Sequence, residues 1–350
     1  MLRKASLFLL LAGGLSAQPK AKNVILLLAD AGGIPTLNAA SAFGYGAPQR
    51  LYVQSWSHIG LSDTSTASEW VTDSAAGMTA IVTGQKTHNG VISQGPDSVR
   101  GSKDGAALKT ILEYAEEHGL STGVLTNVNI ADATPAACYA HVNDRDKHGE
   151  IFSQLFEPRF GDGVDVVMGV GRAEVFANAR AAGKDLDAIS KAKGRPVYES
   201  LAQVPADAKR PIVVQEANID LPEAARAAIA RLKSNRKGYF LMIEWDAHTD
   251  NVERGLTNLV GFDKLIREIA ATVNLKDTLL LFTADHSFDL RLQNGLKADA
   301  VTKGLRMNDS HTGEEVLVAA QGPGSQRVNG FLPNTGLFQI MMDAYGWKPR

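Results

Sequence analysis

The sequence predicts an α/β protein with a central, mainly parallel β-sheet. Short apolar runs alternate with segments of helical periodicity, which is the order of βαβ units. Metal-ligating residues follow several of these runs directly, at the place where such sheets bind ligands. No internal repeat or Gly/Ser-rich linker divides the 350 residues, so we expect residues 18–350 to form a single domain.

Residues 1–17 have the three regions of a secretory signal peptide. Arg3 and Lys4 provide the positive start, residues 7–11 are apolar, and small residues close the segment. The apolar part is too short to span a bilayer, and no later segment has about 18 consecutive apolar residues. We therefore expect a protein exported to the periplasm or beyond, without a transmembrane segment.

The apolar runs are expected to be buried strands. One run ends directly before Asp30, another before Glu244, and a third is followed closely by Asp285 and His286. Parallel strands bring their carboxyl ends to one edge of the sheet, so these four potential metal ligands should lie together. The predicted strands are residues 23–29, 121–126, 164–170, 239–243, 278–283 and 315–320.

Helical patterns occupy residues 107–118 and 222–232, between predicted strands. A closing helix is expected over residues 334–345, with Asn334 and Thr335 as candidate caps. Residues 177–209 are rich in Ala, Lys and Asp and carry no chemical motif. We expect that region to be helical and to lie on the surface.

The charge balance limits the partners of this protein. Lys and Arg number 36 against 38 Asp and Glu, a net charge of −2, which argues against a broad nucleic-acid or anionic-membrane surface. Any bound anion must be held locally, as phosphate is by metal ions and an arginine. Cys138 is the only cysteine, which excludes an intramolecular disulfide and a cysteine metal cluster. Zinc here must be bound by His with Asp or Glu.

Ser74 stands at the start of a run of small helix-forming residues. Taken alone, a serine at that place is most often a helix cap. The functional alternative is a nucleophile, because the amides and positive end of a helix attract phosphate. Zinc would then lower the pKa of the Ser74 hydroxyl.

A second cluster joins residues 130–135 to residues 141–145. One interpretation is a turn made by Asp132, Thr134 and the following proline, with a surface arginine downstream. In the other, Thr134 offers an oxygen to a hard cation and Asp132 accepts hydrogen bonds from its waters. Arg145 would then clamp two phosphate oxygens with its planar guanidinium.

A third cluster combines carboxylates and imidazoles. A lone His or Asp at a strand end is more often a satisfied polar group than a ligand. Two such clusters at successive strand ends, with another histidine nearby, favour a metal site with an open position. The residues are Glu244, Asp246, His248, Asp250, Asp285, His286 and His311.

Five motifs, in order along the chain, resemble those of the alkaline phosphatase family. Any one alone would be weak, but together they are specific, and the resemblance covers residues 23–324. It implies a three-layer α/β sandwich. The motifs are Asp73-Ser74-Ala75, Asp132-Ala133-Thr134-Pro135, the stretch from His141 to Arg145, Thr283-Ala284-Asp285-His286, and His311-Thr312-Gly313.

The resemblance implies hydrolysis of phosphate monoesters through a phosphoserine, at a site with two zinc ions and one magnesium ion. Ser74 is then the nucleophile and Arg145 holds the phosphoryl oxygens. Asp73 and Asp132 would contact the groups around the metal ions without binding the ions themselves. Cobalt could take the place of zinc. The implied ligands are Asp30, Ser74, Asp285 and His286 for one zinc, Asp246, His248 and His311 for the other, and Asp30, Thr134 and Glu244 for magnesium.

The chain departs from the family pattern between Glu244 and Asp250. The family usually separates its magnesium glutamate from its zinc aspartate by several residues, whereas only Trp245 lies between Glu244 and Asp246 here. We favour Asp246 with His248, because the interval from His248 to the following helix is kept. Asp250 remains the rival of His248.

Two further functions are compatible with this sequence. One is a phosphodiesterase or sulfatase on the same scaffold, and the other is a non-catalytic phosphate- or metal-binding relative. The presence of Ser74, Thr134 and Glu244 favours the phosphatase over the phosphodiesterase or sulfatase, and the binding relative is supported only by the altered segment from Glu244 to Asp250. The chain is also short for the family, which puts the usual dimer contacts in doubt, so a monomer and a homodimer both stay open.

Overall fold

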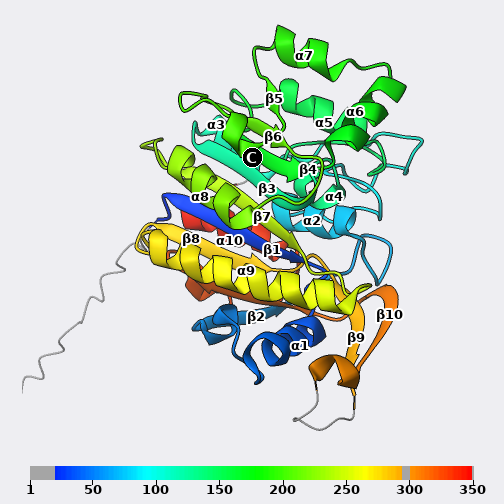
Figure 1. The fold of residues 1–350 in the computed structure, drawn as a ribbon, viewed down its shortest axis with the longest axis vertical. Coiled ribbons are helices and arrows are strands. Elements are labelled where there is room, and N and C mark those ends of the chain that lie inside the picture. Colours follow the sequence, from blue (N-terminus) through cyan, green and yellow to red (C-terminus); the bar gives the residue numbers. More distant parts are fainter. Residues whose placement is uncertain (1–19, 294–299, 349–350) are drawn as a thin grey trace, which may run out of the picture.

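A ten-stranded sheet forms the centre of the molecule in the computed structural model, which describes residues 20–293 and 300–348. The signal peptide predicted over residues 1–17 lies outside these described residues. The strand order is β12-β2-β11-β8-β1-β7-β3-β4-β6-β5 (Figure 1). Its strands are β1 (Asn23–Asp30), β2 (His58–Ser62), β3 (Ser121–Asn129), β4 (Val166–Val170), β5 (Val197–Tyr198), β6 (Ile212–Val214), β7 (Tyr239–Asp246), β8 (Thr278–Thr283), β11 (Val316–Gln321) and β12 (Gly330–Leu332).

The middle of the sheet is parallel, as the sequence predicts. β1 lies between β7 and β8, and β3 extends the parallel set on the far side of β7. β11 runs antiparallel to both β8 and β2. The register places Asp30 at the end of β1 beside Asp246 at the end of β7, so the carboxyl ends of the central strands meet at one edge.

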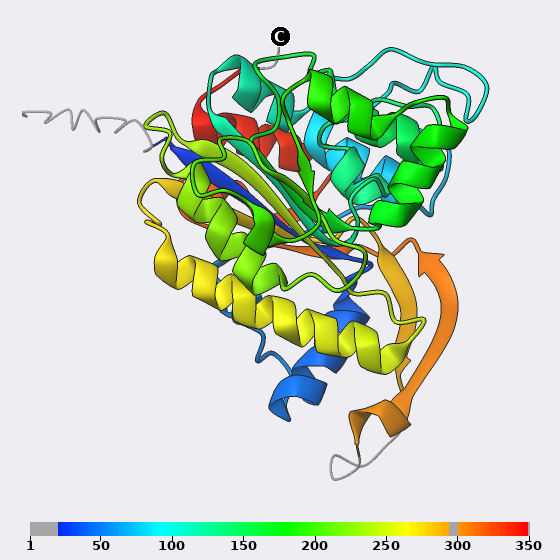
Figure 2. The same ribbon diagram turned by 45° about the horizontal axis from the view of Figure 1, so that its top comes forward.

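Helices cover both faces of this sheet (Figures 1 and 2). α8 and α9 cross one face together with α1, whereas α2, α3 and α10 pack on the other. The helices are α1 (Ile34–Tyr45), α2 (Ser74–Thr83), α3 (Ile111–Glu117), α4 (Ala133–Ala136), α5 (His148–Ser153), α6 (Arg172–Ala181), α7 (Leu186–Ala192), α8 (Leu221–Leu232), α9 (Val252–Thr272) and α10 (Gly336–Tyr345). Short 3-10 helices are η1 (Tyr52–Ser55), η2 (Gln154–Phe156), η3 (Leu201–Gln203), η4 (Val301–Gly304) and η5 (Ser325–Arg327).

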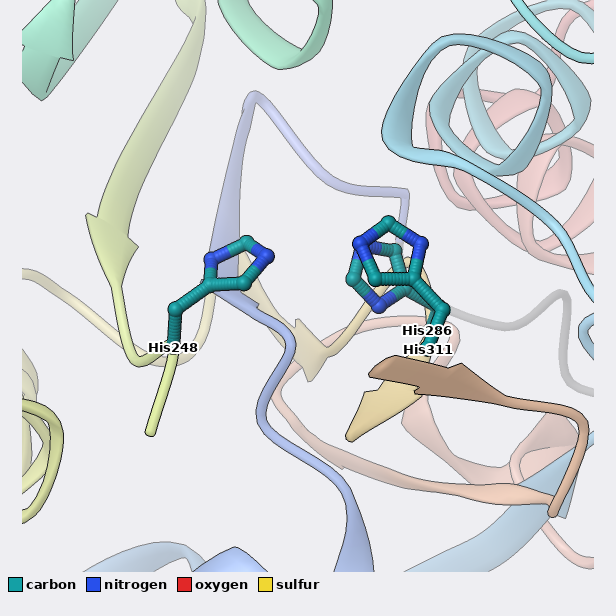
Figure 3. A group of neighbouring side chains, drawn as sticks. All are labelled: His248, His286 and His311. Atoms are coloured by element: carbon teal, nitrogen blue, oxygen red, sulfur yellow. The ribbon is translucent and has the colours of Figure 1, made fainter. Parts of the chain in front are cut away.

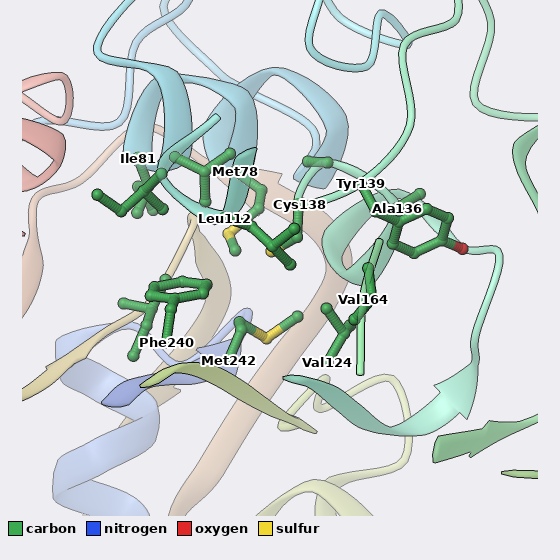
Figure 4. Close-up of a cluster of buried hydrophobic side chains, with 14 of the residues drawn as sticks. Met78, Ile81, Leu112, Val124, Ala136, Cys138, Tyr139, Val164, Phe240 and Met242 are labelled. Atoms are coloured by element: carbon green, nitrogen blue, oxygen red, sulfur yellow. The ribbon is translucent and has the colours of Figure 1, made fainter. Parts of the chain in front are cut away.

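β1 shows why three layers form. Its side chains alternate between the two faces of the sheet, and nearly all are fully buried, so both faces need a covering layer. Leu26 belongs to the core under α2 and α10, and Leu27 to the core under α8 and α9. Figure 4 shows the first of these cores, where Met78 of α2 lies above Met242 of β7. Each fully buried side chain of this kind stabilises the fold by roughly 1.5–3 kcal/mol.

Most predicted elements are found, with shifted ends. The predicted helix 107–118 begins only at Ile111, because Thr110 and Glu113 form a reciprocal capping box there. The closing helix begins at Gly336, with Thr335 at the cap position. The region 177–209 is only partly helical, since β5 and η3 follow α6 and α7.

A hairpin that the sequence does not predict leaves the main sheet near its carboxyl edge. β9 (Ser287–Leu292) and β10 (Leu305–Thr312) pair antiparallel as a separate two-stranded sheet. Figure 2 shows this hairpin reaching outward as an arm. It begins directly after His286 and returns with His311, so its base brings these two histidines together. Among the described helices, none has the length and hydropathy needed to cross a membrane.

Candidate active site

The carboxyl edge of the central strands gathers the predicted ligands. Asp30 is the last residue of β1, Glu244 lies near the end of β7, and Asp285 and His286 directly follow β8 and Ala284. Thr134, in the short helix after β3, places its hydroxyl 3.4 Å from Asp30 Oδ2. The polar residues that follow apolar runs in the sequence therefore do converge.

Ser74 is not a helix cap. Asp73 takes that role for α2, because its side chain accepts a hydrogen bond from the Ala76 amide at 3.0 Å. The Ser74 hydroxyl is thereby left to face the site, with Oγ 3.2 Å from His286 Nε2. Gly77 allows this approach, since a Cβ there would lie 2.8 Å from the Asp285 carbonyl oxygen. The local sequence therefore presents a buried serine to the ligand cluster.

One group of potential ligand atoms comes from Asp30, Asp285 and His286, all within 4.8 Å of one another and all buried. The backbone after β1 bends sharply to complete it. Ala31 adopts a φ of 61°, in the left-handed region that costs a non-glycine residue about 1 kcal/mol. Its amide then donates to Asp285 Oδ1 at 3.3 Å.

A second group consists of His248, His286 and His311, again with ligand atoms within 4.8 Å (Figure 3). The His286 and His311 rings are stacked, with centroids 3.8 Å apart. His311 Nδ1 lies 3.0 Å from the Thr72 carbonyl oxygen, so Nδ1–H donates there and Nε2 is left as a ligand atom. His286 belongs to both groups, which makes the two groups neighbours.

The segment that departs from the family pattern has a definite arrangement. His248 Nδ1 lies 2.8 Å from Asp246 Oδ1, and the His248 ring faces His286 and His311. Asp250 turns instead to Arg254, with Oδ1 2.5 Å from Nη2. The geometry therefore favours His248 over Asp250 as a potential ligand. Asp246, in this arrangement, contacts the histidine and belongs to neither group of the described part of the chain.

Buried carboxylate oxygens without partners show that the site fits metal ions. Within residues 20–293 and 300–348, Asp30 Oδ1, Asp285 Oδ2 and both carboxylate oxygens of Glu244 lack a hydrogen-bond partner. The nitrogens near Asp30 Oδ1 are His286 Nε2 at 3.3 Å and His248 Nδ1 at 3.7 Å, and neither makes a hydrogen bond to it. Leaving buried acceptors unpaired costs roughly 1–3 kcal/mol each. Cations are the partners that oxygens in this pattern require.

The pKa values reflect this crowding of charge. Burial raises the pKa of Glu244 well above its usual range, and the nearby Asp30 carboxylate adds to the rise. Burial, together with Asp30, also raises the pKa of Asp285 to about 6. Burial opposes the charged form of Asp30 too, but His248 and His286 outweigh it and hold its pKa well below normal. Glu244 and Asp285 therefore lack a full countercharge among the described side chains.

Arg145 is fixed between two carboxylates. Its Nη1 donates to Asp73 Oδ2 at 3.2 Å and its Nη2 to Asp132 Oδ1 at 2.8 Å. Burial alone would lower the pKa of Arg145, but these carboxylates raise it, so the guanidinium is charged at any relevant pH. Asp73 thus caps the helix of Ser74 and also orients Arg145, which couples the positions of the two residues.

Arg100 holds the backbone that carries Arg145 and is not evident from the sequence. It donates to Asp144 at 3.0 Å and to Asp146 at 2.9 Å, the two residues on either side of Arg145. Its side chain lies over Gly90, whose carbonyl accepts a hydrogen bond from the Arg145 amide at 2.8 Å. A side chain at Gly90 would collide with Arg100.

A cleft of about 450 Å³ opens beside the ligand groups. Its walls include Val128 near the end of β3, Arg254 at the start of α9, and Phe288 and Ser310 at the base of the hairpin. The rule that identified Asp30 also applies to Asn127, which directly follows a predicted strand and accepts from the Asp246 amide at 2.8 Å. No sequence pattern marks Arg254.

Comparison with known proteins agrees with this geometry. The family model described as alkaline phosphatase matches residues 21–210 and 205–302. Streptomycin-6-phosphate phosphatase of Streptomyces griseus is 31% identical, over 95% of this chain and 92% of that protein. Alkaline phosphatase of Escherichia coli K12 is 29% identical, over 97% and 88%. The structure of alkaline phosphatase from the Antarctic bacterium TAB5 superimposes with a TM-score of 0.80 at 27% identity, covering 95% of this chain and all of that one. The chain therefore belongs to the alkaline phosphatase family.

Proposed function

We propose that this protein is an alkaline phosphatase that hydrolyses phosphate monoesters through a phosphoserine on Ser74, at a site for two zinc ions and one magnesium ion. The observation that carries the proposal is the convergence of unpaired buried carboxylate oxygens beside a serine hydroxyl that caps nothing. A TAB5 alkaline phosphatase mutant that is 28% identical, with a TM-score of 0.79, is described with Mg bound, which supports magnesium.

The residues present divide among three ions. Asp30, Asp285 and His286 would hold the zinc next to Ser74, and His248 and His311 would hold the other, with Asp246 beside them. Glu244, Thr134 and Asp30 would surround magnesium, because they offer only oxygen atoms. When bound, the zinc ions supply Lewis-acid stabilisation of the attacking and departing oxygens.

The chain's own groups then perform the displacement. Arg145, held rigid by Asp73 and Asp132, aims its remaining N–H groups at the phosphoryl oxygens. Ser74 Oγ, at the positive end of α2, gives up its proton to water and attacks phosphorus. The bond from phosphorus to the alcohol oxygen breaks on the opposite side, and that oxygen takes a proton from water. Water then cleaves the phosphoserine and returns the Ser74 hydroxyl. Preorganised charge provides most of the rate enhancement, as in other phosphoryl transfers.

The test is hydrolysis of p-nitrophenyl phosphate by the purified mature protein after chelation and after return of zinc, magnesium or both. We expect full activity only with both ions. Chelation should also lower the melting temperature, since ions bound by the folded state alone stabilise it. Ser74→Ala should melt like the parent protein with metals and form no labelled phosphoenzyme. A labelled phosphoserine elsewhere in the chain would contradict the assignment of Ser74.

Three substrates separate the proposed phosphatase from the two competing functions. A phosphate diester or a sulfate ester hydrolysed faster than the monoester would indicate a phosphodiesterase or sulfatase. Phosphate binding that survives chelation, without turnover under any metal, would indicate a binding protein. Export rests on the sequence of residues 1–17 and is checked by locating the protein in fractionated cells.

A further inference from the structure

We propose that the pair Asp250 and Arg254 selects the leaving group, favouring esters of neutral polyhydroxylated alcohols such as sugars and polyols. This inference rests on the proposed phosphatase function and adds a substrate class to it. The pair lines the same cleft as Asp30, His248 and His311. At about 450 Å³ the cleft is within the size range of sites that bind whole small molecules, so it has room for more than a phosphoryl group.

The other carboxylates of the cleft already have partners. Asp132 accepts from Arg145 and Asp246 contacts His248, while Asp30 stands in the proposed metal cluster. Among the described carboxylates that line the cleft, Asp250 is the one that remains, and its partner is Arg254 at 2.5 Å. Arg254 therefore supplies a positive charge to the cleft that is separate from the proposed metal cluster and from Arg145.

The position of Arg254 is set by the start of α9. Asn251 caps the helix by accepting a hydrogen bond from the Arg254 amide at 3.1 Å, which fixes the first turn. The contact with Asp250 four residues earlier then holds the guanidinium at the cleft wall. Asp250 and Arg254 are 41% and 48% exposed, so both are accessible to a ligand. An ion pair this exposed contributes little to folding, which suits a role in recognition.

The chemistry of the pair indicates the kind of alcohol. Within the described residues, Arg254 makes its side-chain hydrogen bond through Nη2 to Asp250, so its other N–H groups are free to donate. Asp250 has a second oxygen that can accept. A hydroxyl both donates and accepts, and neighbouring hydroxyls of a polyol match such a pair. The pair is neutral overall, so a charged group on the leaving group is attracted by one partner and repelled by the other, whereas a hydroxyl can bond to both.

The cleft contributes further to this match. Ser310, exposed on β10, adds a hydroxyl to the lining of the cleft, and Val128 and Phe288 add apolar surface to it. Phe288 is itself held by edge contact with the ring of His248, at 5.2 Å between centroids. A lining that combines apolar side chains with a few polar groups is typical of sites that bind small molecules.

The decisive comparison uses n-propyl phosphate and glycerol 1-phosphate, whose leaving groups differ only in hydroxyls. We expect the metal-loaded protein to favour glycerol 1-phosphate by about tenfold in kcat/KM, the size of one hydrogen bond to a charged group. Arg254→Gln should abolish this preference, because it lowers kcat/KM for glycerol 1-phosphate about tenfold more than for n-propyl phosphate. Calorimetry should show the same preference in the affinities of the two esters for metal-loaded Ser74→Ala, which binds them without turnover.

Arg226→Gln is the matched control, because Arg226 is also an exposed, ion-paired arginine, bound to Glu268 at 3.0 Å on the surface of α8. Arg226→Gln should change kcat/KM for neither of the two esters. Equal rates for the two esters in the parent protein, or an equal loss of both in Arg254→Gln, would overturn the inference. A preference for 3-phosphoglycerate that Arg254→Gln removes would also overturn it, in favour of anionic leaving groups. Failure of the proposed function is distinct, since p-nitrophenyl phosphate would then not be hydrolysed at all.

Discussion

Replacing Glu244 with glutamine should make the metal-free protein more stable and the metal-loaded protein less stable. Glu244 is fully buried on β7, and neither of its carboxylate oxygens has a hydrogen-bond partner within the described residues. Burial raises its pKa well above the usual range. At pH 8 the unfolded chain therefore gains more free energy by ionising Glu244 than the folded, metal-free chain does. Glutamine keeps the shape of the side chain and removes this difference.

The expected magnitudes follow from the contacts. Unpaired buried acceptors cost roughly 1–3 kcal/mol each, and a neutral amide still bears part of that cost, so we expect a gain of about 2 kcal/mol without metal. With magnesium at a hundred times its Kd, the parent protein gains about 2.7 kcal/mol that the variant should largely lose. A chain of this size changes its melting temperature by about 2 °C per kcal/mol. The metal-free variant should therefore melt about 4 °C higher than the metal-free parent, and the variant should lose about 5 °C of the rise that magnesium gives the parent.

The assay is thermal unfolding at pH 8 of both proteins, after chelation and after addition of magnesium with zinc held constant. Glu116→Gln is the control, because Glu116 is also buried but its oxygens accept from Thr122 Oγ1 and the Gly163 amide. Its melting shift on adding magnesium should equal that of the parent. If Glu244→Gln melts no higher than the parent after chelation, or gains as much from magnesium, Glu244 is not a metal ligand of the kind proposed here.

Three further predictions address other parts of the structure. Arg100→Gln should raise KM and the inhibition constant of phosphate by up to about fivefold with little change in kcat, because Arg145 loses its support. Arg100→Lys should restore part of the loss, and a drop in kcat alone would argue against positioning. Gly77→Ala should destabilise the protein by about 1–3 kcal/mol in urea unfolding, although alanine favours helices, because the added Cβ would lie 2.8 Å from the Asp285 carbonyl oxygen. An unchanged midpoint would show that the helix can shift freely. Burial raises the pKa of Glu116 from 4.5 to about 7, so the folded state keeps a proton that the unfolded state releases. Stability should therefore fall by on the order of 3 kcal/mol as pH rises from about 4.5 to about 7, and Glu116→Gln should remove that fall. Parallel stability curves for parent and variant would contradict the assignment to this group.

Several features of the site can be predicted from the sequence because they depend on local rules. Continuous apolar runs identify buried parallel strands, and the residues that follow them must reach the same sheet edge. That rule alone locates Asp30, Glu244, Asp285 and His286 at the site. It also applies to Asn127, which the sequence analysis misses because an amide is not expected to hold a ligand segment in place.

Other features depend on contacts between segments far apart in the chain. Whether Ser74 caps its helix is open from the sequence, since Asp73 and Ser74 are both good caps, and only the backbone geometry shows that Asp73 does so. The approach of His311 to His286 requires the β9–β10 hairpin, whose two strands lack the continuous apolar pattern of the main sheet. Arg100 meets Asp144 and Asp146 across 44 and 46 residues, and surface arginines carry no pattern that reveals such a partner.

The layered sheet and the identity of the chemical groups at its edge can be predicted from the sequence, because hydrophobic periodicity and residue type are local properties. Which of those groups are shared, paired or left without a partner depends on the packed chain. Packing places His248 beside His286 and His311 and turns Asp250 toward Arg254. That choice depends on where a short loop lies relative to a neighbouring strand and helix, and the distances between segments are fixed only when the chain is packed.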